Sequence, residues 1–176
     1  MARYLALGSV IAMAIVIVAA PPAQAQNNTE ALAAADILYR DGSYAQARAA
    51  YSRVLSAESE NVKALNNRGL AHARLGDLNA AREDLDKALK LEKRNGDLWN
   101  NSANVSCSMK RYAEAFEHRQ FAFYNGRFSL EQAQRTLRRL GYFYGLSDAV
   151  WDIDEDRALK DWTEAGCPNA PADRLL

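Results

Sequence analysis

The chain has 176 residues, and its 22 basic and 22 acidic side chains give a formal net charge of zero. This balance argues against a nucleic-acid-binding protein, which would carry a clustered excess of lysine and arginine. Two cysteines are too few for a disulfide-dense scaffold, and the two histidines lie far apart without metal-ligand spacing. We therefore expect no nucleic-acid partner, no metal site and no cofactor.

Residues 1–25 have the three parts of a secretory signal peptide. Arg3 gives a positively charged start, residues 5–20 are almost wholly apolar, and residues 23–25 read Ala-Gln-Ala, the small-residue pattern that a signal peptidase needs. The alternative is a retained membrane anchor, but the run of about 16 residues is short for a span, which needs about 20. We predict cleavage before Gln26, a periplasmic or secreted protein, and no membrane attachment afterwards.

The next part of the chain repeats its pattern at a constant step of 34 residues, in columns of aromatic or apolar and of small residues. These columns are Tyr44, Leu78 and Tyr112; Ala47, Ala81 and Ala115; Ala35, Gly69 and Ala103; and Val54, Ala88 and Ala122. Gly42 and Gly76 share a further column with Lys110. A step of this length is typical of arrays of paired helices. The pattern predicts an all-α fold with three units, at residues 28–61, 62–95 and 96–128.

Within the second unit, apolar residues at helical spacing predict helices over 62–75 and 78–91, separated by a turn at Gly76. Small residues at Gly69 and Ala81 mark a close helix contact. Together with the repeat step, and with Trp99 where a large aromatic residue is favoured, these features resemble the tetratricopeptide repeat family over about 100 residues. The resemblance implies a curved solenoid whose concave face holds partners. Lys110 at a turn makes the third unit the least regular, and no proline closes a unit.

The family geometry implies that the first helix of each unit lines the concave groove. The predicted partner-binding residues are Tyr39, Arg40, Lys63, Asn66, Asn67, Arg74, Asn100, Asn101 and Asn104, and Asp36, Leu70, Asp97 and Cys107 fall on the same face. Asparagine side chains both donate and accept hydrogen bonds, which suits an extended backbone or a glycan. Solvated polar positions are the alternative. The carboxylate clamp of cytosolic co-chaperones in the family is not expected, because only Asn67 matches its pattern.

The pattern changes after Gly126, where the 34-residue step fails. Helices are predicted over about 130–140 and 154–165, and each is followed by a glycine. A run of matched positions resembles a helical peptidoglycan-binding domain: Gln134, Leu137, Leu140, Gly141, Tyr142, Gly145, Asp148, Trp151, Ala158, Leu159 and Trp162. Ala149 and Thr163 depart from that family's pattern. Residues 129–176 are predicted to form a small helical domain that either binds peptidoglycan or caps the last repeat.

In the wall-binding alternative, Tyr142, Tyr144 and Trp151 would contact glycan strands; otherwise they form the core of the small domain. Cys107 and Cys167 could form a disulfide, which the sequence leaves open because it cannot place the two sulfur atoms. No nucleophile with a positioned base and no phosphate-binding loop is present. The sequence thus predicts an exported, non-enzymatic adaptor that binds a protein partner. Alternatives are a peptidoglycan-binding wall protein and self-association through the repeats.

Overall fold

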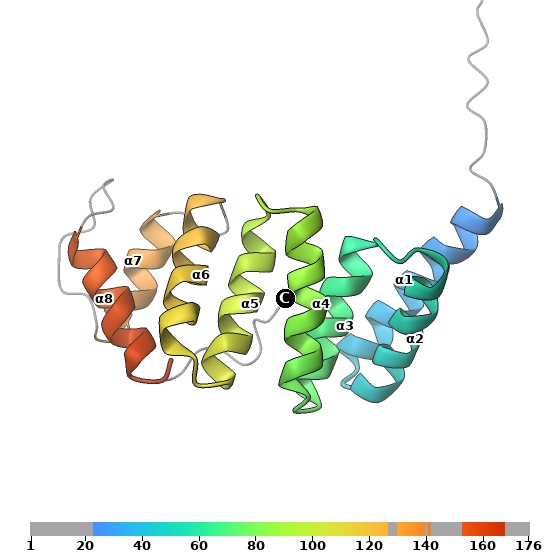
Figure 1. The fold of residues 1–176 in the computed structure, drawn as a ribbon, viewed down its shortest axis with the longest axis horizontal. Helices are drawn as coiled ribbons and strands as arrows, with labels where there is room; N and C mark the ends of the chain where they lie inside the picture. The colour runs from blue at the N-terminus through green and yellow to red at the C-terminus, as the bar shows by residue number, and fades with distance from the viewer. Residues whose placement is uncertain (1–22, 127–129, 140, 142–152, 168–176) are drawn as a thin grey trace, which may run out of the picture.

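The computed structural model describes residues 23–126, 130–139, 141 and 153–167, and the fold is all-α, as predicted (Figure 1). The helices are α1 (Ala23–Arg40), α2 (Tyr44–Ala57), α3 (Val62–Arg74), α4 (Leu78–Leu91), α5 (Gly96–Ser108), α6 (Tyr112–Tyr124), α7 (Leu130–Arg139) and α8 (Ile153–Glu164). In the described part of the chain, none of these helices combines the length and the apolar character that a membrane span needs.

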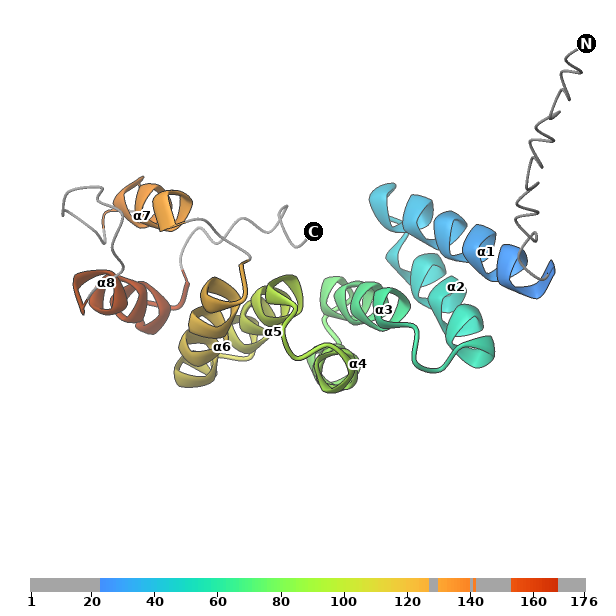
Figure 2. The ribbon, with the colours of Figure 1, turned by 90° about the horizontal axis from the view of Figure 1, so that it is seen from above.

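The helices stack as pairs along one axis. Seen from above, α1, α3, α5 and α7 lie along one side of the row, and α2, α4, α6 and α8 lie along the other (Figure 2). The helices predicted for the second unit are confirmed to within one residue. The first helix begins at Ala23, five residues before the predicted start of the first unit, so α1 of the full sequence spans the predicted cleavage point.

A Glu-x-x-Asn sequence closes both loops between units. The Asn61 side chain caps α3 by accepting from the Ala64 backbone N–H, and its Nδ2 donates to Glu58 at 2.8 Å. Asn95 caps α5, and its Nδ2 donates to Glu92, also at 2.8 Å. Such caps satisfy backbone donors that a helix leaves free at its start. Each loop between units therefore ends in an asparagine that caps the next helix. No proline closes these units.

The turns inside the units adopt a left-handed backbone. Gly42 and Gly76 have φ angles of 79° and 83°, and Lys110 holds φ at 60° in the same column. Glycine adopts this conformation freely, whereas a residue with a Cβ is strained by about 1–2 kcal/mol. The backbone of the third turn thus follows the other two despite the unfavourable residue.

Small residues allow the two helices of a unit to approach closely, as predicted. Ala81 is fully buried, and a Cβ added to Gly69 would lie 3.1 Å from the Ala81 carbonyl oxygen and 3.3 Å from Leu85 Cγ. The equivalent residues Ala35 and Ala103 are fully buried as well. The continuous core between the helices depends on these positions, because interiors are packed without spare volume.

The C-terminal pair packs on the third unit through α8. Trp162, Leu159 and Leu137 form a buried cluster against which Phe116 of α6 packs. Gln120 donates to Asp156 at 3.1 Å. In the regular units, the first helix of a pair packs against the preceding unit, as α3 does on α2, but here the second helix takes that place. This difference in packing explains why the 34-residue step does not continue into these helices.

A disulfide between Cys107 of α5 and Cys167 after α8 ties the C-terminal pair to the third unit. The two Cα atoms are 6.3 Å apart, and the residues are separated by 60 positions in sequence. The predicted helix boundaries of the pair agree with α7 and α8 to within one residue. The structure therefore places this segment where a terminal cap of a repeat array would lie.

Candidate partner-binding groove

A row of hydrogen-bonded side chains, which we call the amide row, crosses all three units. Asn101 of α5 donates to Asn66 of α3 at 2.9 Å. Asn66 donates to its neighbour Asn67 at 2.8 Å, and Asn67 donates to Asp36 of α1 at 2.9 Å. The first helices of the three units are thus joined by one chain of polar contacts that ends at a carboxylate.

Asp36 collects three donors at the end of the amide row. Besides Asn67, the Tyr51 hydroxyl donates to Asp36 at 2.7 Å, and Lys63 Nζ lies 2.7 Å from its other oxygen. Burial alone would raise the pKa of Asp36, but the hydrogen bonds from Lys63, Tyr51 and Asn67 outweigh it and hold the pKa below the ordinary value. The row therefore ends on a charged carboxylate at neutral pH.

Three predicted groove residues are buried, which corrects their expected role as open contacts. Tyr39, Asn100 and Asn101 are only 5%, 5% and 4% exposed, and Leu70 on the same face is fully buried. Tyr39 packs edge-on against Tyr44 with ring centroids 5.3 Å apart. Burial leaves the side chains of Tyr39, Asn100 and Asn101 little surface for a partner.

The other predicted groove residues keep some or all of their surface accessible: Arg40, Lys63, Asn66, Asn67, Arg74 and Asn104. Two tyrosine side chains hold Arg74 in place. Its Nε donates to the Tyr39 hydroxyl at 3.4 Å, and its guanidinium lies 5.8 Å from the centroid of the Tyr44 ring. Burial is the main cause that raises the pKa of Tyr39, so this hydroxyl remains a neutral partner for Arg74.

In the third unit, a buried arginine makes the polar contact that Tyr51 makes with Asp36 in the first unit. Arg119 is 8% exposed, and its Nη2 donates to Asn104 at 2.8 Å. Its guanidinium also lies 4.3 Å from the centroid of the Trp162 ring in α8. Burial lowers the pKa of Arg119 to about 9. Two repeat steps earlier, the residue equivalent to Asn104 is Asp36, and the residue equivalent to Arg119 is Tyr51. These two also share a hydrogen bond, so the same pair of positions is in contact in the first and third units.

The sequence predicts no role for Arg119. The signal was the replacement of Tyr51 and Leu85 by a charged residue at a position that faces the core. In the structure, this replacement adds a contact between the third unit and the C-terminal pair, because Arg119 reaches Trp162. An aromatic face attracts a cation over it.

A second pair of positions carries polar contacts within the units. In the second unit, Arg68 donates to both oxygens of buried Asp84 at 2.7 Å. In the third, the hydroxyl of Ser102 and Nδ1 of His118 lie 3.0 Å apart. Ser102 is only 2% exposed, so its hydroxyl is not open to a substrate. Its position in the register indicates a structural contact rather than an activated nucleophile.

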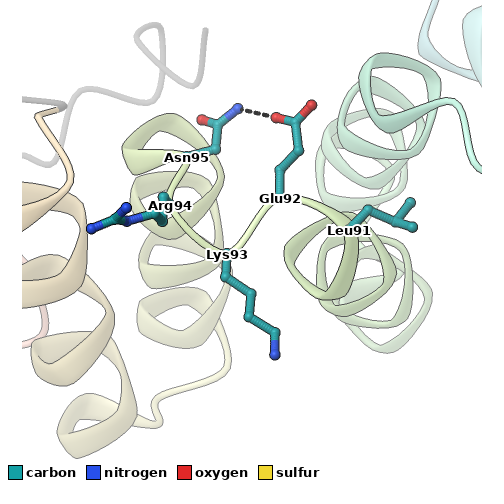
Figure 3. Close-up of a pocket in the computed structure, with 5 residues that line it drawn as sticks. All are labelled: Leu91, Glu92, Lys93, Arg94 and Asn95. Atoms are coloured by element: carbon teal, nitrogen blue, oxygen red, sulfur yellow. Dashed lines mark hydrogen bonds between the residues drawn. The ribbon is translucent and has the colours of Figure 1, made fainter.

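Other predicted sites lie outside the described residues, including the glycan-contact candidates Tyr142, Tyr144 and Trp151. Among the side chains that the structure does describe, no group of three or more histidines, cysteines and acids is arranged to hold a metal ion. A shallow hollow is lined by residues 91–95 in the loop between α4 and α5 (Figure 3). Its Asn95–Glu92 hydrogen bond belongs to the cap described above, and Lys93 and Arg94 point outward from the loop (Figure 3).

Comparison with known families agrees with this geometry. Residues 32–97 match the tetratricopeptide repeat family model. Residues 32–97 are thus similar to this family, and the paired, stacked helices agree with that match. No curated protein matches the sequence.

Solved structures show the same fold at low sequence identity. The chain is similar to a mutant of the O-GlcNAc transferase of Thermobaculum terrenum, with a TM-score of 0.62 and 21% identity, over 83% of this chain and 27% of the transferase. It is also similar to a tetratricopeptide repeat protein from Parabacteroides merdae, with a TM-score of 0.58 and 18% identity, over 85% of this chain and 56% of that one. The chain thus spans only part of each of these proteins.

Proposed function

We propose that the protein is an exported adaptor that holds an extended segment of a protein partner along the amide row. The family is generally a protein–protein interaction module, which supports a protein as the partner. The observation that carries the proposal is the continuity of the row across three helices, from Asn101 to Asp36. An extended backbone presents donors and acceptors at regular intervals, and a row of amides complements such a ligand.

The amide row keeps hydrogen-bonding capacity for a ligand. An asparagine side chain has two N–H groups and two acceptor lone pairs. Asn66 and Asn67 each use one N–H and one lone pair within the row, and both side chains are partly accessible. The internal bonds also hold the amides in place, so a ligand would bind without paying the full entropy of ordering them.

The signal-peptide pattern of residues 1–25 supports export in this proposal, and the disulfide between Cys107 and Cys167 accords with it. The packing of α8 on α6 supports a capping role for the C-terminal pair. In this proposal the pair completes the array and leaves the groove as the surface for the partner. Its resemblance to a wall-binding domain then reflects local sequence rather than function.

Site-specific photo-crosslinking in the source cell tests the proposal. A photoreactive residue at Arg74 probes the groove, and one at exposed Lys87 of α4 serves as the matched control on the other row of helices. We expect a discrete crosslinked protein from position 74 alone. Adding Asn67→Ala should weaken that crosslink at least five-fold while the purified variant keeps its helical circular dichroism. Equal products from both positions, or no effect of Asn67→Ala, would contradict binding along the amide row.

A further inference from the structure

The third unit places a cation beside a sulfur atom at positions that are apolar in the second unit. Nη2 of Arg119 lies 3.9 Å from Sγ of Cys107. One repeat step earlier, these positions hold Leu85 and Ala73, which pack together in an apolar cluster. The second unit shows that the fold needs neither a charge nor a sulfur atom here. Packing within the array therefore does not explain this contact.

The positive charge of Arg119 is poorly compensated. Its side chain donates to Asn104, but its Nε is buried without a hydrogen-bond partner among the described residues. Burial is the cause of the lowered pKa of Arg119, and within the described part of the chain no carboxylate counteracts it. A buried cation is costly unless an anion pairs with it. An anion formed beside Arg119 would therefore be stabilised.

Reduction of the disulfide between Cys107 and Cys167 can supply that anion, because a cysteine beside an arginine ionises more readily than a free one. The two sulfur atoms have different surroundings. Cys107 is partly accessible, whereas Cys167 is 6% exposed and its Sγ lies 3.9 Å from the Thr163 carbonyl oxygen. A carbonyl oxygen accepts a hydrogen bond from a thiol and does not stabilise a thiolate. Reduction should therefore leave Cys107 as a thiolate and Cys167 as a thiol.

We propose that the Cys107–Cys167 disulfide is an exchange site for a dithiol reductant, and that Arg119 holds the Cys107 sulfur as a thiolate in the reduced protein. A disulfide whose reduced form is stabilised in this way is easier to reduce. The reaction removes the covalent link between the C-terminal pair and the third unit. The reductant thereby acts beside Asn104, a predicted residue of the groove.

The exchange takes two steps and transfers two electrons. In the first step, a thiolate of the dithiol attacks the accessible Sγ of Cys107. The S–S bond breaks, and its electron pair leaves on Cys167, which takes up a proton. In the second step, the other thiol of the reductant loses its proton and attacks the reductant's own sulfur in the mixed disulfide. Cys107 leaves as the thiolate beside Arg119, and the dithiol is oxidised to a disulfide; a more stable leaving thiolate speeds this step.

The second unit supplies two matched substitutions for a test. Arg119→Leu removes the cation, whereas Asn104→Leu keeps the cation and removes its hydrogen-bond acceptor. The second unit has leucine at both positions, Leu85 and Leu70, and both are fully buried. The purified full chain is equilibrated at pH 7 with mixtures of reduced and oxidised dithiothreitol. Alkylation of free thiols and gel electrophoresis then give the reduced fraction and the equilibrium constant for reduction.

We expect Arg119→Leu to lower the equilibrium constant for reduction by about ten-fold or more, which corresponds to about 30 mV. Asn104→Leu should raise it, because the cation then depends more on the thiolate. A general loss of packing would ease reduction in both variants, so opposite directions separate the proposal from a structural effect. A smaller decrease for Arg119→Leu, or a change in the same direction in both variants, would overturn it.

A spectroscopic measurement tests the thiolate directly. Cys167→Ala leaves Cys107 unpaired, and its thiolate should be visible by ultraviolet absorbance at pH 7. Adding Arg119→Leu should abolish that absorbance, because the neutral side chain no longer stabilises the anion. Equal thiolate absorbance in the two proteins, or none in Cys167→Ala, would also overturn the proposal. Neither measurement depends on whether the groove binds a partner.

Discussion

Asn67 donates a hydrogen bond of 2.9 Å to Asp36 and so joins the second unit of the array to the first. The two residues lie 31 positions apart and on different helices, α3 and α1. The bond adds a polar contact to the apolar packing between neighbouring units, and it holds the end of the proposed binding row. Stability and partner binding should therefore respond together when this contact is changed.

Asp36→Asn should lower the free energy of unfolding at pH 7 by roughly 1–3 kcal/mol, since hydrogen bonds to a charged group contribute on that order. Because the folded-state pKa of Asp36 lies below its ordinary value of 3.8, its stabilisation is complete above that value and is lost as the pH falls through the folded pKa. Urea unfolding of both proteins between pH 7 and pH 2.5 measures the difference. We expect it to shrink on the acid side; a difference that grew there would contradict the assignment.

Lys110→Gly should stabilise the protein by roughly 1 kcal/mol, because glycine relieves the left-handed strain at the third turn. The reciprocal change Gly76→Lys should destabilise by a similar amount. An added Cβ at Gly76 meets no atom within 4 Å, so this variant reports backbone strain alone. Thermal unfolding at matched concentrations measures both. Shifts of the same sign in the two variants would show that strain at the turn does not govern stability.

The effects on stability of substituting Asn104 and Arg119 should be coupled, because the two side chains form one buried contact. The equivalent residues in the second unit are Leu70 and Leu85, both fully buried. Asn104→Leu alone should destabilise by about 1–3 kcal/mol, because it removes the acceptor from a buried guanidinium. The double variant with Arg119→Leu should recover most of that loss, since a paired hydrophobic replacement of a buried charge is often neutral or stabilising.

A double-mutant cycle measured by chemical denaturation quantifies this coupling. Arg119→Leu supplies the fourth corner. If the two single changes simply add, Arg119 does not depend on Asn104, and its contact with Trp162 must carry the role instead.

The disulfide should hold the C-terminal pair on the third unit. Removing it with Cys107→Ser should lower the free energy of unfolding by about 2–4 kcal/mol, because the closed loop of the cross-linked chain restricts the unfolded state. Differential scanning calorimetry with and without a thiol reductant provides the measurement. Reductant should lower the melting temperature of the wild-type protein and leave that of Cys107→Ser unchanged. A wild-type protein insensitive to reductant, under conditions that expose free thiols, would contradict this role.

The sequence by itself determined the helices and turns of the array. The repeat step located Gly42, Gly76 and Lys110 at equivalent turns, and it identified Gly69 and Ala81 as the close contact in the second unit. These features depend on residues within one unit, where local conformation and a helix-to-helix contact leave a regular trace in the sequence.

Only the tertiary structure decided which residues of the groove face remain accessible. Asn67 and Asn101 hold equivalent places in neighbouring units, yet Asn67 is partly accessible and Asn101 is buried. The docking of α8 on α6 and the pairing of Cys107 with Cys167 were also beyond the sequence. Burial and long-range pairing depend on how whole units and the C-terminal pair pack against one another. That arrangement is set by contacts between distant segments, which no single stretch of sequence contains.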